Sequence, residues 1–114
     1  MANIYKNAKL DLTTNTVVTL YTVPSDSRAI IKSILVSDDT NNGSSITGDL
    51  FNGPPASASK FNLFKRKAVS GNQTVQLLQE PLIMMESEVI QVTATDANRL
   101  HVVASILEIN RNDQ

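Results

Sequence analysis

Short runs in which apolar and polar residues alternate predict that this chain is built from β-strands. In residues 4–12 most even positions are apolar, whereas Asn7, Lys9 and Asp11 occupy the other face. Successive side chains of a strand point to opposite faces, so this run predicts one buried face and one face in water. Residues 28–36 are apolar on both faces instead, which predicts a central strand covered by protein on both sides.

Prolines and polar turn residues divide the rest of the chain into similar segments. The clearest strand-breaking turns contain Pro24, Gly53 and Gly71. The segments between these turns are rich in β-branched residues. The predicted strands are 4–12, 17–23, 28–36, 46–51, 60–70, 73–78, 88–94 and 100–109, with a short edge segment at 82–85. Residues 60–70 also fit a helical stripe, and a strand is preferred there because the neighbouring segments are strands.

About eight short strands with regularly spaced turns predict an all-β chain, folded as a single antiparallel β-sandwich or jelly-roll-like domain. The domain is expected to span residues 1–114, with flexible ends at 1–3 and 110–114. No internal repeat or linker divides the chain.

Composition narrows the function more by exclusion than by assignment. The chain has 114 residues, 41% of them hydrophobic, no cysteine and one histidine. Disulfides, thiolate metal sites and cysteine nucleophiles are therefore excluded, and acid–base catalysis has few candidates. A net charge of −1 shows no basic surplus for binding nucleic acid. No run approaches the roughly 20 apolar residues of a membrane span, and no export signal is visible, so folding in a cytoplasm is expected.

The individual candidates for chemistry are weak. His101 lies on a strand face without a second metal ligand, which favours a histidine at the edge of the core or in a subunit contact. Residues 38–49 partly match a calcium loop but lack its final glutamate, so a solvated turn is preferred. Glu86 and Glu88 flank a turn without a cleft. We therefore predict no catalytic residues, no cofactor, no metal and no enzyme activity.

A basic run, Lys65-Arg66-Lys67, lies close to Phe61 and Phe64. This mixture is found in proteins that bind single-stranded nucleic acid, which leaves that alternative open. The preferred interpretation is an edge strand whose positive charges discourage pairing with another sheet.

Five segments resemble, in order, a family of small virion structural proteins of tailed bacteriophages, especially those of marine bacteria. They lie at residues 4–7, 20–24, 28–34, 80–82 and 98–105. The resemblance covers nearly the whole chain and includes no catalytic motif. It implies a component of the virus particle made of a compact β domain.

The hypothesis drawn from this resemblance is a capsid decoration, or cement, protein that binds the major capsid protein on the outer shell. It would act as a homo-oligomer, for instance a trimer, without contact to nucleic acid or membrane. The alternatives are a component of the neck, tail or fibre base, and a module that binds host-surface glycans. The residues predicted to contact other subunits or the capsid are Ile4, Tyr5, Lys6, Phe61, Phe64, Lys65, Arg66 and Lys67.

Overall fold

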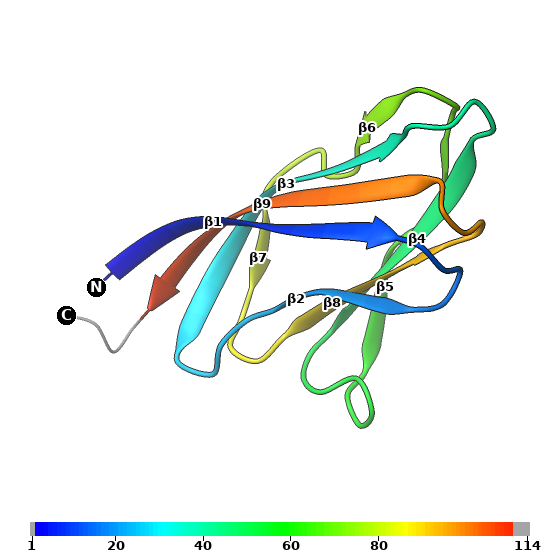
Figure 1. Cartoon of the computed structure of the whole chain (residues 1–114). Helices are drawn as coiled ribbons and strands as arrows, with labels where there is room; N and C mark the ends of the chain where they lie inside the picture. The colour runs from blue at the N-terminus through cyan, green and yellow to red at the C-terminus, as the bar shows by residue number, and fades with distance from the viewer. Residues whose placement is uncertain (1, 111–114) are drawn as a thin grey trace.

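Nine β-strands make up most of the part of the chain that the computed structural model describes, residues 2–110 (Figure 1). In chain order they are β1 (Ala2–Leu12), β2 (Val18–Thr22), β3 (Ser27–Asp38), β4 (Ser44–Phe51), β5 (Lys60–Val69), β6 (Thr74–Gln76), β7 (Leu82–Met84), β8 (Val89–Ala94) and β9 (Leu100–Asn110). The all-β prediction is confirmed, and the ambiguous segment 60–70 forms a strand, β5, over all but its last residue. No helix able to cross a membrane occurs within residues 2–110.

The strands form two antiparallel sheets that pack face to face. The first sheet has the order β1-β9-β3-β6, with β7 also paired to β3, and the second has the order β2-β8-β4-β5. The antiparallel pairs are therefore nested along the chain: β1 with β9, β2 with β8, β3 with β6 and β7, and β4 with β5. This is the arrangement of a jelly roll, as predicted.

The sixth strand is shorter than predicted, because a side chain takes over part of the pairing. The Gln76 amide oxygen accepts hydrogen bonds from the backbone N–H groups of Ile34, at 2.9 Å, and Leu78, at 3.2 Å. The ladder therefore ends at Gln76, and a separate strand, β7, pairs with the other half of β3.

The core lies between the two sheets and is made of the alternate residues that face inward. In β9, Leu100, Val102, Ala104 and Ile106 are buried, while the residues between them are partly or fully exposed. The largest fully buried side chains are Leu12, Ile31, Ile34, Ile46, Met84, Ile90, Leu100 and Ile106. These residues come from both sheets, so the core holds the two sheets together.

Residues 28–36 were predicted to form a central strand with protein on both faces. The central position was right, but burial on both faces was wrong. Strand β3 is central, with β9 on one side and β6 and β7 on the other. Its outward-facing Leu35 is 40% exposed, however, and Ile30 is only partly buried. The second apolar face is thus only partly covered within the described residues.

The two ends of the described chain lie side by side in the first sheet. Ala2 pairs with Asn110 and Asn3 pairs with Ile109, so these residues belong to strands β1 and β9. The remaining residues of the predicted flexible ends, residue 1 and residues 111–114, lie outside the described part of the chain.

Candidate interaction surfaces

The outer face of the first sheet carries a row of apolar side chains that crosses four strands. Tyr5 on β1 pairs with Leu107 on β9, Leu107 pairs with Ile30 on β3, and Ile30 pairs with Ile83 on β7. Directly opposed residues of antiparallel strands point to the same face, so the four side chains form one line, the apolar row. Tyr5 is 75% exposed and Ile83 is 64% exposed.

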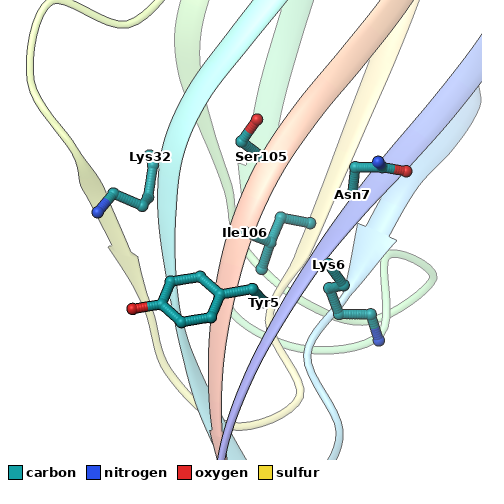
Figure 2. A pocket seen from close by; sticks show the side chains of 6 residues that line it. All are labelled: Tyr5, Lys6, Asn7, Lys32, Ser105 and Ile106. Atoms are coloured by element: carbon teal, nitrogen blue, oxygen red, sulfur yellow. The ribbon is translucent and has the colours of Figure 1, made fainter.

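A shallow hollow lies beside the apolar row, with a volume of about 310 Å³. Figure 2 shows the Tyr5 ring reaching from β1 across β9 toward β3, which carries Lys32, while the small side chain of Ser105 lies further along β9. Ser105 is smaller than Val103 and Leu107, which flank it on the same face of β9, so the surface dips at this point. Beyond the hollow a second apolar pair, Val103 and Leu35, lies on the same face.

A buried polar cluster ties the edge of the first sheet to the edge of the second. Glu108 on β9 is only 6% exposed, and it accepts hydrogen bonds from the Tyr21 hydroxyl on β2 and from Lys6 Nζ on β1, the latter at 3.2 Å. The Lys6 ammonium also lies 5.8 Å from the centre of the Tyr21 ring, within range of a cation–π interaction. Burial, the hydrogen bond to Glu108 and the charge of Glu108 together raise the pKa of Tyr21 far above its ordinary value.

The three predicted N-terminal contact residues therefore have different roles. Tyr5 lies on the outer face, whereas Lys6 points toward the other side and pairs with Glu108. Ile4 is opposite Glu108 in the ladder and is 47% exposed at the sheet edge.

The predicted basic strand is an edge strand: β5 is the last strand of the second sheet. Lys65, Arg66 and Lys67 are all exposed along it. Arg66 has a positive φ of 51° at an irregularity in the pairing of β4 with β5, and its backbone N–H donates to Thr47 Oγ1 at 3.0 Å. The predicted edge position is thus confirmed.

Phe64 does not join this exposed group. It is partly buried and packs against the core, with its ring over Gly48 of β4. A Cβ atom at Gly48 would lie 2.3 Å from Phe64 Cζ, so only glycine leaves room for the ring. Phe61, by contrast, is 54% exposed. An aromatic platform for nucleic acid would need both rings on the surface beside the cations, and the fold separates them.

The two groups of predicted contact residues do not form one surface. Strand β1 is an edge of the first sheet and β5 is an edge of the second. Across the sandwich, β1 contacts β2, which is the opposite edge of the second sheet from β5, while β5 contacts β3.

The outer face of the second sheet is polar, in contrast to the first. Its side chains bond to one another across the strands: Ser45 with Thr95 at 2.6 Å, Gln91 with Thr19 at 3.1 Å, and Asn62 with Asp49 at 2.9 Å. A hollow on this side, of about 460 Å³, is bordered mainly by hydroxyl groups and by the cations of β5. The sandwich therefore carries an apolar row on one outer face and mainly polar side chains on the other.

The other candidates for chemistry have structural roles. His101 lies on the outer face of β9, with Nε2 3.3 Å from Asp11 Oδ1 and Nδ1 3.8 Å from Asp39 Oδ2. Asp38 is buried, and its Oδ1 accepts hydrogen bonds from the backbone N–H and the hydroxyl of Thr40, which shapes the turn predicted for this loop. Within residues 2–110, no three His, Cys, Asp or Glu side chains are arranged to hold a metal ion.

The paired glutamates also belong to the fold. Glu88 Oε1 accepts a hydrogen bond from the backbone N–H of Met85 at 2.7 Å, across a turn. Glu86 Oε1 lies 3.4 Å from Arg28 Nε. Each carboxylate thus has a partner within the first sheet or the turn that follows β7.

The apolar row is the feature that the sequence interpretation missed. Its signal was present in residues 28–36, which are apolar on both faces, but burial on both faces was the expected explanation. The row itself could not be read from the sequence because its four residues come from four strands.

No protein-family model matches this sequence, and no curated protein matches it. Several solved structures share the fold. A chain of the T13 particle of infectious bursal disease virus superposes with a TM-score of 0.62 at 6% identity, covering 95% of this chain and 31% of the viral chain. A chain of T=1 particles derived from the same virus has a TM-score of 0.58 at 7% identity, covering 98% and 32%.

A subunit of the disulfide-linked pili of Bacillus endospore appendages is also similar, with a TM-score of 0.53 at 12% identity. It covers 95% of this chain and 88% of its own. This chain therefore spans about a third of the viral chains and nearly all of the pilus subunit. At these identities the likeness shows the fold alone.

Proposed function

We propose that this chain is a non-enzymatic structural protein of a bacteriophage particle, most specifically a capsid decoration protein. It binds the major capsid protein on the outer shell as a homo-oligomer and stabilises the shell, after folding in the host cytoplasm. The resemblance of five sequence segments to virion proteins of tailed phages supports this proposal, as does a fold shared with a viral particle protein.

The observation that carries the proposal is the apolar row on the outer face of the first sheet. Tyr5 and Ile83 expose most of their apolar surface at its two ends. A contiguous exposed apolar surface bounded by polar residues is typical of a site that binds another protein. Each contact of a small domain can be weak, since many copies on one shell act together.

A filament subunit is a second candidate because the pilus protein shares the fold over nearly its whole length. This chain contains no cysteine, however, so it cannot form the disulfide links named for those pili. A location at the neck, tail or fibre base of the phage uses the same fold and the same surface. Copy number separates it from decoration.

The test is quantitative mass spectrometry of purified phage particles that carry the protein, with the major capsid protein as internal standard. Decoration predicts a copy number comparable to that of the major capsid protein. A few copies per particle would instead place the protein at the neck or tail. Absence from the particles would reject both locations.

A further inference from the structure

The free edge of β1 is a second exposed feature of the first sheet. Strand β1 pairs with β9 along all of its eleven residues, and no described residue pairs with its other side (Figure 1). In an antiparallel ladder the N–H and C=O groups of alternate residues point away from the partner, so about half of these residues present unpaired groups at the edge. A long open edge of this kind is a template for another strand.

We propose that the occupant of this edge is β1 of a second copy, paired antiparallel about a twofold axis at Asn7. Strand β1 runs from Ala2 to Leu12, so Asn7 is its central residue. Pairing about Asn7 uses the whole strand and places Ala2 opposite Leu12 of the second copy.

The side chains of β1 are complementary to themselves in this register. Ile4, which is 47% exposed in one chain, meets Leu10 of the other, so apolar surface is covered. Tyr5 meets Lys9, which allows a cation–π contact, and Asn3 meets Asp11, which allows a hydrogen bond. No like charges face each other.

Neighbouring registers lack this complementarity. A shift of the axis to Lys6 or to Lys9 places two lysines opposite each other, which is destabilising. An axis at Ala8 leaves part of β1 unpaired and puts Lys6 opposite Leu10. Axes between residues would join the outer face of one copy to the inner face of the other, because side chains alternate along a strand.

The pairing also joins the apolar surfaces of the two copies. The apolar row of one chain ends at Tyr5, and Lys9 of the second chain would continue it toward Val103 and Leu35 of that chain, which lie in line with Lys9. The dimer thus has two such lines across one continuous sheet. The use of this joined outer face to bind the shell rests on the proposed function. The pairing of β1 with β1 does not depend on it.

A single cysteine tests the pairing directly, since the chain has none of its own. In Asn7→Cys the new thiol would meet its copy at the axis, where opposed Cα atoms lie about 4.5–5.5 Å apart, within disulfide range. We expect mild oxidation to convert most of this variant to a covalent dimer. The control is Thr19→Cys, an exposed position on β2, the edge of the other sheet, and it should remain largely monomeric.

A charge exchange at the axis provides the second test. Asn7→Lys and Asn7→Asp should each weaken self-association about fivefold or more because like charges meet at the axis. An equimolar mixture of the two should restore it as a heterodimer, and Asn7→Ser should associate like the parent. Light scattering of the parent should give twice the chain mass of 12.4 kDa at high micromolar concentration.

Equal cross-linking of the two cysteine variants, or a mass of one or three chains, would overturn the twofold pairing. If the parent is a monomer in solution and its Asn7→Lys variant fails to bind shells, the pairing is also overturned. The β1 edge would then be assigned to a strand of the shell protein. These results are distinct from failure of the proposed function. A protein that forms the dimer but is absent from particles would reject the function and keep the pairing.

Discussion

Glu108 is a buried charged residue whose polar contacts join the two sheets. Its carboxylate is almost inaccessible, and it has a charged partner in Lys6 and a neutral donor in Tyr21. A buried carboxylate is tolerated only where such partners replace its hydration. The cluster holds Lys6 on the inward side of β1, the side that also carries Leu10 and Leu12, and the alternation of the strand then leaves Tyr5 on the outer face.

The pH dependence of stability should reveal this cluster. The pKa of Tyr21 is raised in the folded chain, so its contribution to stability is complete below the unfolded value of about 10. Above pH 10 the unfolded chain loses the Tyr21 proton while the folded chain keeps it. We expect the free energy of unfolding to fall by up to about 1.4 kcal/mol per pH unit there.

Tyr21→Phe isolates the effect. It should lower the free energy of unfolding at neutral pH by about 1–2 kcal/mol, because a hydrogen bond to a charged group is lost, and it should flatten the fall above pH 10. Urea titrations at several pH values measure both. Tyr5→Phe, at the only other tyrosine, is the matched control and should change the neutral-pH value by less than about 0.5 kcal/mol. If the free energy of unfolding of Tyr21→Phe falls above pH 10 as much as that of the parent, groups other than Tyr21 cause the fall.

At the scale of elements, the edge strands β5 and β1 differ in the positive charge that they expose. Strand β5 carries a run of exposed cations along its open edge, whereas Lys6, one of the two lysines of β1, has its charge paired with Glu108. Exposed lysine on an edge discourages further pairing. This difference favours β1 over β5 as the edge that accepts another strand.

Removal of one of these cations should expose the edge. We expect Lys67→Thr to aggregate more than the parent during refolding at high protein concentration, measured by light scattering, with little change in the midpoint of unfolding. Lys32→Thr makes the same change of charge on central strand β3 and should refold like the parent. Equal aggregation of both variants would attribute the effect to net charge instead of the edge.

At the scale of the whole molecule, the two outer faces have opposite character. The face of the first sheet carries the apolar row, and the face of the second is covered by side chains that bond to one another. A sandwich with this asymmetry can lie on a partner with one side while the other remains in water.

Two exposed aliphatic residues allow a matched test of this orientation. Ile83 is 64% exposed in the apolar row, and Val17 is 57% exposed beside the second sheet. We expect Ile83→Lys to weaken binding to capsid shells by about tenfold or more, since burial of an isoleucine side chain is lost. Val17→Lys should bind like the parent, and both should unfold at the parent temperature. Equal binding by the two variants would exclude the apolar row as the contact.

Substitution is preferable to truncation at the N-terminus. Deletion of residues 1–7 would remove the pairing partner of half of β9 and leave Glu108 buried without Lys6. Loss of binding would then reflect damage to the sheet as much as loss of a contact. Tyr5→Ser removes the exposed ring alone.

The strands and the jelly-roll class were predictable from the sequence, because alternation and turn residues act over a few positions. The same is true of the position of β5, whose cations indicate an edge. Gln76 shows the limit at this scale: nothing local indicates that its side chain bonds to Ile34, which is far away along the chain.

The amino-acid sequence by itself determined which side chains alternate, where the turns fall, and that no cysteine chemistry exists. The tertiary structure decided which strands are neighbours. Strand pairing placed Tyr5, Leu107, Ile30 and Ile83 in one line. It also packed the Phe64 ring over Gly48 and brought Lys6 to Glu108. The physical reason is that strand pairing aligns residues far apart in the chain, so a surface built across strands has no periodicity within any one segment.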